Sequence, residues 1–264
     1  MGCENPKYIV QDTVIAGETG AAGPIGPAGV IDRAAILPIY TSEITHNGNE
    51  RTNEVMNALM DELLYIPIAI SNYLLTVGAQ VSAAIQVQLG ATVTSISFGW
   101  SINKTATSQA ISGPQVSASV PPGTIIYTAT GLAITSDATY ALTIGDGTTS
   151  PVSNATVAFL NNRYWGAAGA PGSIDSAFVK GLSNNELTTT RSKTFTVTAG
   201  ANDYIWYAYP KRFGLAIFSF SGIEGGFDTP SEITLFVNEE GYTEPYYVFR
   251  STTKGLGATT LTAS

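Results

Sequence analysis

Large apolar residues alternate with small polar residues through the middle of the chain. The alternation is clearest in three segments, residues 95–102, 140–144 and 157–159. In the first segment the large positions are Ile96, Phe98, Trp100 and Ile102, and serine or glycine stands between them. A period of two residues is typical of a β-strand with one face in a core and the other in water. The pattern therefore predicts short strands over residues 80–160.

Turn signals between these segments indicate the kind of β-domain. Gly145-Asp146-Gly147 separates two alternating segments, and Pro121-Pro122-Gly123 marks another connection because proline cannot donate in a sheet ladder. Strands at this spacing fit an immunoglobulin-like (Ig-like) β-sandwich of about 80 residues. The chain has one cysteine, Cys3, so such a domain would lack the disulfide of antibody domains.

A second β-rich region is predicted for residues 161–264. Its expected strands are centred on residues 195–197, 204–209, 233–237, 246–250 and 259–261. Half of the aromatic residues of the chain lie between Asp203 and Phe249. In residues 204–209 they occupy both faces of the expected strand, so they cannot all point into one core.

Three interpretations account for these surplus aromatic residues. They can pack across a subunit interface, hold the sugar rings of a host glycan, or belong to an ordinary core, and we favour them in that order. The candidate interface or glycan-binding residues are Tyr204, Trp206, Tyr207, Tyr209, Tyr246 and Tyr247.

A helical segment is expected before the β-domains. From Asn49 the chain holds good helix formers and no helix breaker before Pro67. Apolar residues recur there at alternating steps of three and four, the a/d spacing of a coiled coil. They are Met56, Leu59, Leu63, Ile66, Ile70, Tyr73 and Val77. The spacing predicts a short trimeric coiled coil, and an amphipathic helix packed on the sheet of its own chain fits it as well.

Glycine occupies every third position near the N-terminus. The repeat runs through Gly17, Gly20, Gly23, Gly26 and Gly29. In a collagen triple helix glycine alone fits at the crowded axis, and the prolines that follow two of these glycines favour the extended conformation. The repeat predicts three chains, although four triplets need neighbouring segments to hold them together. The alternative is a flexible linker rich in glycine, alanine and proline.

Composition and charge exclude several classes of protein. Charged residues make up 12% of the chain and the net charge is −8, which argues against a broad basic surface for nucleic acid. The longest apolar stretch, near residues 63–77, is too short and too interrupted for a membrane helix, so we expect no membrane insertion. Met1-Gly2-Cys3 lacks the context of a lipidation signal.

Catalytic and metal-binding chemistry has little support in the sequence. The one histidine, His46, lies in an expected loop without a motif partner, so neither a histidine-based triad nor a zinc site is predicted. The glycine-rich segment opens no helix and lacks the Gly-Lys-Ser/Thr of a phosphate loop. We therefore expect no catalytic residue, metal or cofactor. Sugar cleavage by a pair of carboxylates stays an open alternative, because the distance between the two groups depends on the fold.

Four segments carry a resemblance to known proteins. They are TVTSISFGWSINK (92–104), YALTIGDG (140–147), VAFLNNRYWG (157–166) and YIWYAYPKRFG (204–214). These segments resemble structural proteins of phages, including head and tail fibres of Bacteroides phages of the crAss-like group. The resemblance covers residues 85–264 and implies a virion appendage whose N-terminus docks into the particle while its C-terminal region points outward. The chain is short for a host-binding tail fibre, so a compact head fibre fits at least as well.

The combined expectation is a mainly β protein with an extended N-terminal part. The expected parts are a virion anchor peptide (1–16), a collagen-like segment (17–29), a linker and helical trimerisation segment (30–79), an Ig-like sandwich (80–160) and a β-rich tip domain (161–264). The predicted function is a non-enzymatic, homotrimeric fibre on the virion surface, bound to capsid or other virion proteins through its N-terminus. The alternatives are a tail-fibre or tail-tip protein that binds host surface glycan, and a spike that degrades polysaccharide.

Overall fold

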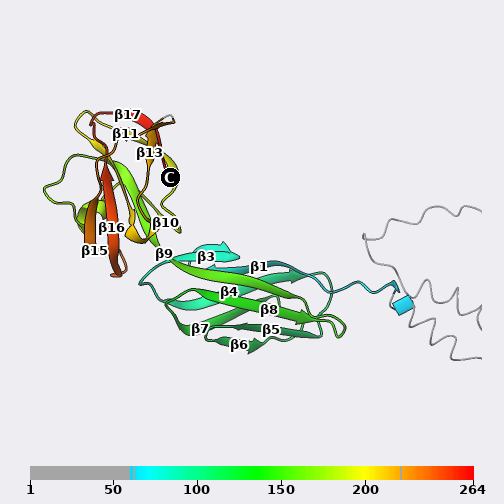
Figure 1. Cartoon of the computed structure of the whole chain (residues 1–264). Helices are drawn as coiled ribbons and strands as arrows, with labels where there is room; N and C mark the ends of the chain where they lie inside the picture. The colour runs from blue at the N-terminus through cyan, green and yellow to red at the C-terminus, as the bar shows by residue number, and fades with distance from the viewer. Residues whose placement is uncertain (1–59, 62, 221) are drawn as a thin grey trace, which may run out of the picture. The chain divides into compact units, whose positions relative to one another are not determined.

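The computed structural model describes residues 60–61, 63–220 and 222–264 (Figure 1). The expected anchor peptide, the collagen-like segment, and Met56 and Leu59 of the expected coiled coil lie outside the described residues. The chain divides into two compact units, Met1–Ile66 and Pro67–Ser264.

The described residues of the first unit begin with a helical turn. Met60, Asp61 and Leu63 are helical, and the Leu64 N–H donates to the Met60 carbonyl oxygen at 2.9 Å. Leu63 and Ile66, two residues of the expected trimer seam, are exposed.

The second unit is mainly β-structure, as predicted, and begins with a two-layer sandwich. One layer has the strand order β2-β1-β4-β7. Its strands are β1 (Ile70–Val77), β2 (Gln80–Ser82), β4 (Val93–Ile102) and β7 (Ile126–Ile134). The facing layer contains β3 (Ala84–Gln88), β5 (Ser108–Gly113), β6 (Val116–Ser119), β8 (Ala138–Gly145) and the first part of β9 (Val152–Ala168).

The predicted alternation is confirmed in the core of this first sandwich. Ile96, Phe98 and Trp100 of β4 are buried, as are the large positions of β8. The Phe98 ring contacts the Tyr140 ring across the two layers, with ring centroids 5.3 Å apart. Burial of these apolar side chains from both layers holds the sandwich together.

The heptad pattern is wrong from Ile70 onward, because Ile70–Val77 forms β1. This strand pairs with β4, and its register shifts between Ser71 and Leu74, where Asn72 has a positive φ of 53°. The irregularity inserts one residue, so the inward positions fall at Ile70 and Tyr73 rather than two residues apart. A bulged strand thus imitates the three-residue step of a coiled coil. We expected the sandwich to begin at residue 80. Ile68 already belongs to its core, so it begins earlier.

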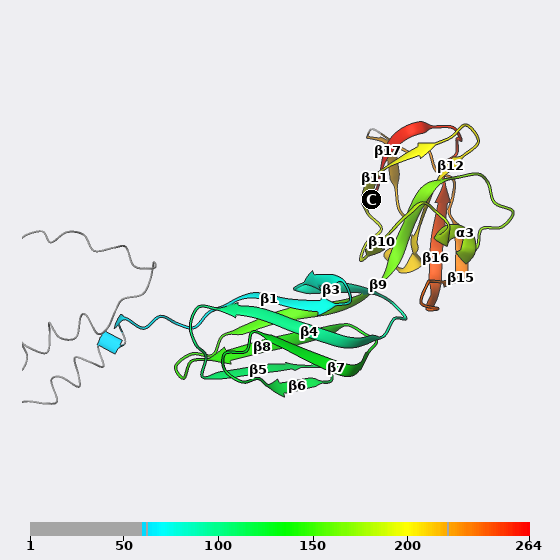
Figure 2. The same cartoon turned by 180° about the vertical axis from the view of Figure 1, so that it is seen from behind.

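Strand β9 continues from the first sandwich into the C-terminal β-region, residues 161–264 (Figures 1 and 2). Its first part pairs with β8 and, in parallel, with β3. Its second part pairs with β10 (Asn184–Thr188) and β12 (Tyr204–Pro210). The whole sheet has the order β15-β16-β12-β9-β8-β5-β6, with β15 (Ser231–Val237) and β16 (Thr243–Arg250) at one end.

Both faces of β12 are buried in the C-terminal β-region. One face packs on a separate sheet of order β11-β17-β13-β14 through Tyr207 and Tyr209. That sheet comprises β11 (Lys193–Ala199), β17 (Gly257–Ala263), β13 (Phe218–Phe220) and β14 (Ile223–Glu224). The other face packs on the short helix α3 (Ser176–Lys180), where the Phe178 and Trp206 ring centroids lie 4.8 Å apart.

Two cores therefore account for the surplus aromatic residues within one chain. Trp206, Tyr207, Tyr209 and Tyr246 are each at most 1% exposed, so the expectation that they face a second subunit or a glycan is wrong. The inference that one core cannot hold them is correct, but a second core on the opposite face takes the remainder.

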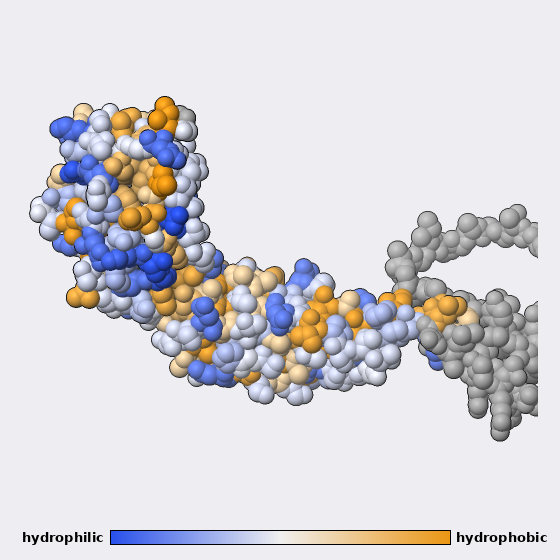
Figure 3. Space-filling model, in the orientation of Figure 1, coloured by the Kyte–Doolittle hydropathy of each residue, from blue (hydrophilic) through white to orange (hydrophobic). Residues whose placement is uncertain are grey.

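The face of the second unit seen in Figure 3 is mostly weakly polar, with apolar side chains between the polar ones. Among the described residues, no helix combines the length and the apolar character needed to cross a membrane.

Candidate functional site

A groove of about 550 Å³ lies in the C-terminal β-region. It lies between residues 215–218 on one side and residues 224–230 on the other, with Phe249 of β16 also in its lining. Three phenylalanine rings pack together there. The ring centroids of Phe218 and Phe227 are 3.9 Å apart, and those of Phe218 and Phe249 are 5.0 Å apart. The groove therefore has a packed aromatic lining.

The wall formed by residues 215–217 is fixed by hydrogen bonds on both sides. The short helix η2 (Lys211–Phe213) precedes this wall, and the Arg191 Nη1 donates to the Phe213 carbonyl oxygen at 2.7 Å. The Tyr209 hydroxyl donates to the Gly214 carbonyl oxygen at 2.8 Å. Ile217 and Ser264 exchange two backbone hydrogen bonds of 3.0 Å. Hydrogen bonds therefore hold the backbone on both sides of this wall.

The opposite wall is held by an ion pair. The Arg250 Nη2 and Nε donate to the Asp228 carboxylate at 2.6 and 2.9 Å, and the Asp228 N–H donates to the Arg250 carbonyl oxygen at 2.9 Å. The Arg250 guanidinium also lies over the Tyr204 ring, 4.8 Å from its centroid. Gly226 closes the turn before Phe227 with a φ of +79°, and a Cβ there would clash with the Phe220 ring.

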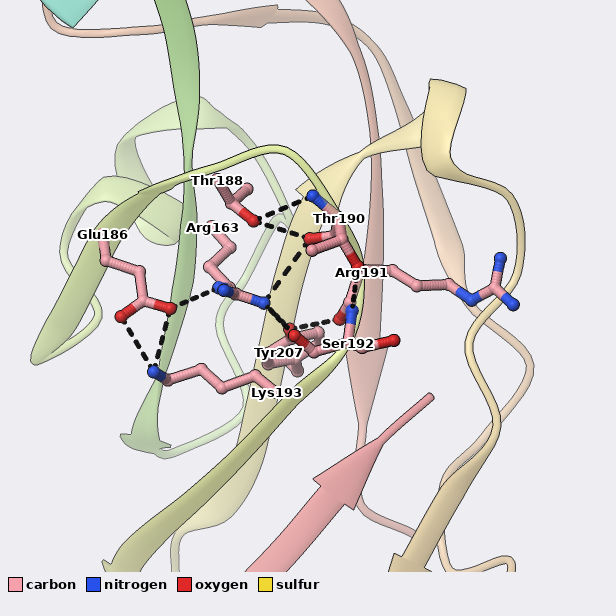
Figure 4. A network of polar contacts seen from close by, with 8 residues as sticks. All are labelled: Arg163, Glu186, Thr188, Thr190, Arg191, Ser192, Lys193 and Tyr207. Atoms are coloured by element: carbon pink, nitrogen blue, oxygen red, sulfur yellow. Dashed lines mark hydrogen bonds and ion pairs between the residues drawn. The ribbon is translucent and has the colours of Figure 1, made fainter. Parts of the chain in front are cut away.

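A polar network surrounds Arg163 and includes the backbone of Arg191 (Figure 4). At its centre Arg163 of β9 donates from Nε to the Glu186 carboxylate at 2.6 Å and from Nη1 to the Ser192 carbonyl oxygen. The Tyr207 hydroxyl donates to the Arg191 carbonyl oxygen at 2.6 Å. These contacts fix the backbone around Arg191, whose side chain in turn holds the Phe213 carbonyl.

Glu186 is shared by two cations in this network. Its carboxylate contacts Arg163 at 2.6 Å and Lys193 at 2.8 Å. Burial alone would raise the pKa of Glu186, but the hydrogen bond from Lys193 and the positive charges of Arg163 and Lys193 outweigh it. The pKa of Glu186 is therefore held below its ordinary value of 4.5.

The lowered pKa of Glu186 predicts that the free energy of unfolding depends on pH. Because the folded pKa lies below the unfolded one, the contribution is present above pH 4.5 and is lost as the pH falls through the folded pKa. We expect the stability difference between the wild type and Glu186→Gln to shrink from pH 6 to about pH 3, by well under 1 kcal/mol because the side chain is partly exposed. Urea unfolding at several pH values measures this difference. A gap that widens in acid would contradict the assignment.

The structure places the predicted site residues apart from the groove. Tyr204 and Tyr247 are half-buried, and each lies against a cation, Arg250 and Lys211 respectively. Neither belongs to the lining of the groove. Three lining phenylalanines, Phe218, Phe227 and Phe249, lie within the aromatic-rich segment, but no pattern distinguishes them there from the other aromatic residues. Leu215 and Ile217 follow a glycine and show no strand or helix period over several residues, so no pattern marked them.

The lining of the groove combines apolar side chains with two acidic ones. Among the described residues that line it, the charged ones are Glu224 and Asp228. The described part of the chain holds no group of three histidine, cysteine, aspartate or glutamate residues that could bind a metal ion. No protein-family model matches the chain, and no curated protein matches its sequence.

Proposed function

We propose that the chain is a non-enzymatic structural subunit of a virion surface fibre, a homotrimer anchored by its N-terminus. The observation that carries this proposal is strand β9, which belongs to the first sandwich and to the C-terminal β-region without interruption. A fibre must hold its outer part firmly on its inner part. A shared strand does so better than a flexible linker, because bending it would break ladder hydrogen bonds on both sides.

The strand order of the first sandwich supports an Ig-like fold. Strands β1, β4 and β7 are neighbours in one layer, and β9, β8, β5 and β6 are neighbours in the other. These orders correspond to A-B-E and G-F-C-C′ of the Ig fold, which many surface proteins use. The order supports a surface role by analogy of fold, and the virion assignment itself depends on the resemblance of the sequence segments.

Side-chain contacts reinforce the junction around β9. The buried Asn238 donates from Nδ2 to the Leu89 carbonyl oxygen and to the Asn161 Oδ1, each at 2.7 Å. Asn161 donates to the Glu244 carboxylate, and Gln88 to the Glu239 carboxylate. The first sandwich is thus joined to the C-terminal β-region by side chains as well as by the shared strand.

The groove favours a second role for the same fibre, attachment to a host surface. Its walls are fixed and it carries exposed apolar and acidic groups, which suits a binding site. In this version the C-terminal β-region recognises the host, as in the receptor-binding alternative from the sequence.

Light scattering of the full chain tests the trimer. We expect a mass of three times 27.6 kDa. Gly23→Asp is expected to lower the trimer fraction, because glycine alone fits at the axis of a collagen helix. Ala22→Asp is the matched control, since it adds the same charge at an outward position of the adjacent triplet, Gly20-Ala21-Ala22, and should leave the trimer intact. A monomer at every concentration would exclude the trimer, and immunogold labelling of virions separately tests the location.

A further inference from the structure

The chain enters the first sandwich at one end and leaves it at the other. Ile68 directly precedes β1 at the entry, and its N–H donates to the Asp146 carboxylate of the β8–β9 turn at 3.2 Å. Strand β9 begins after that turn, runs through the sandwich and passes into the C-terminal β-region (Figures 1 and 2). A pull between the residues before Pro67 and the C-terminal β-region would therefore act along the strands.

Side chains fasten the chain where it enters. Asn103 bridges two backbone groups of residues 67–69, with bonds of 2.9 and 3.0 Å. The Asp146 carboxylate accepts a third backbone bond, from residue 68, and pairs with the Lys104 Nζ at 2.6 Å. These side chains follow the ends of β4 and β8, and we call their contacts with residues 67–69 the entry lock. The lock ties the start of β1 to both layers of the sandwich.

A lengthwise pull would load β1 and β9 in shear. Strand β1 begins at the entry lock and lies antiparallel to β4, while β9 lies between β8 and the parallel strand β3. Ladder bonds lie across the strands, so a pull along a strand stretches the bonds of its ladder together, whereas a pull across the strands opens them one at a time. Beyond the first sandwich β9 is held on both sides by β10 and β12.

We propose that the first sandwich transmits tension between the N-terminal segment and the C-terminal β-region, with the entry lock, β1 and β9 as the load path. This function goes beyond a fixed connection, because it makes the resistance to a pull depend on its direction. Only the source of the tension, a particle pulled against a surface, rests on the proposed fibre. The resistance belongs to the chain itself and can be measured without a virion.

Single-molecule pulling with optical tweezers tests this dependence on direction. DNA handles are attached to introduced cysteines of the full chain in a Cys3→Ser background. Both handle pairs use Leu63→Cys, an exposed position before the entry lock. The lengthwise pair adds Ala170→Cys just beyond β9, and the crosswise pair adds Thr148→Cys in the turn beside the lock, both at exposed positions. We expect the lengthwise pair to unfold at a several-fold higher force.

Two matched variants test the entry lock in the lengthwise pair. Asn103→Ala removes two bonds to backbone groups on the load path. Gln115→Ala removes two bonds of 2.9 and 3.0 Å to the Ala133 backbone of β7, which lies off the path, and both side chains are exposed. We expect a lower unfolding force for Asn103→Ala and an unchanged force for Gln115→Ala, with similar small losses in urea unfolding.

Two results would overturn the proposal. One is an equal unfolding force in the two pulling directions. The other is an equal effect of the two variants, because overall stability and not the load path would then set the resistance. Neither result decides where the protein resides, which immunogold labelling tests separately.

Discussion

Replacing Arg163 with methionine is expected to lower the free energy of unfolding by about 2 kcal/mol. The Arg163 side chain is 11% exposed and lies between β9, β10 and the turn that precedes β11. Methionine fills a similar volume but donates no hydrogen bond. The loss therefore reports on the polar contacts and not on a cavity. Urea unfolding of the full-length variant measures the change.

The magnitude follows from the groups that Arg163 leaves behind. The Ser192 carbonyl oxygen, the Thr190 carbonyl oxygen and the Tyr207 hydroxyl oxygen each lose a donor. The Thr190 carbonyl oxygen keeps the Thr188 hydroxyl as a donor, and Thr190 and Ser192 are exposed residues whose carbonyl groups water can reach. Each lost contact therefore costs about 1 kcal/mol or less. Glu186 keeps its contact with Lys193 and is partly exposed, so its charge is not stranded. This places the total below the range for a broken buried ion pair that leaves a charge without a partner.

Lys211→Met is the matched control for Arg163→Met. Lys211 also pairs with a glutamate, Glu232, at 2.6 Å, but both side chains are well exposed. Exposed pairs contribute about 0–1 kcal/mol, so we expect a change within that range. Equal losses in the two variants would mean that burial does not set the strength of the Arg163 network.

The first sandwich could be predicted because its strands have one buried and one wet face. In β4 the apolar residues point into the core and the serines and glycines lie on the other side, so the sequence period equals the structural one. The Gly145-Asp146-Gly147 turn was also predictable, because Asp146 accepts the Thr148 and Thr149 N–H groups and thereby closes the loop before β9.

The C-terminal β-region departed from prediction because β12 is buried on both faces. In the sequence, aromatic residues on both faces of residues 204–209 indicate more apolar surface than one core can bury. A second chain is one way to cover that surface. The structure covers it with α3 and with the β11-β17-β13-β14 sheet of the same chain. Nothing in residues 204–209 could reveal these covering elements, because they come from other parts of the sequence.

The groove could not be predicted for a similar reason. Its lining comes from three separate stretches, residues 215–218, 224–230 and Phe249, which the fold brings together. The apolar character of Leu215 and Ile217 is visible in the sequence, but their exposure is not. That exposure depends on the bonds from Arg191, Tyr209 and Ser264, and each of these is a tertiary contact.

The Asn238→Ala substitution is expected to destabilise the second unit by about 3 kcal/mol and to loosen the junction around β9. The Asn238 side chain is buried and makes four hydrogen bonds. Besides donating to Leu89 and Asn161, its Oδ1 accepts the Glu240 and Tyr242 N–H groups at 3.0 and 2.8 Å. Alanine leaves all four partners without their bond. Hydrogen exchange should therefore quicken most in residues 88–91 and 239–243, and urea unfolding gives the total loss.

Asn103→Ala is the matched control for Asn238→Ala. It shows how much stability is lost when an exposed asparagine that joins two backbone groups is removed elsewhere in the fold. Asn103 also joins two backbone groups, since its Oδ1 accepts the Ala69 N–H at 2.9 Å and its Nδ2 donates to the Pro67 carbonyl oxygen at 3.0 Å. It is exposed, so water replaces both bonds and we expect a loss of about 1 kcal/mol or less. If Asn238→Ala changed exchange evenly along the chain, the junction would be no stiffer than its surroundings. The shared strand would then have to hold the two β-regions together without help from Asn238, and the fibre proposal would lose the support of the junction contacts.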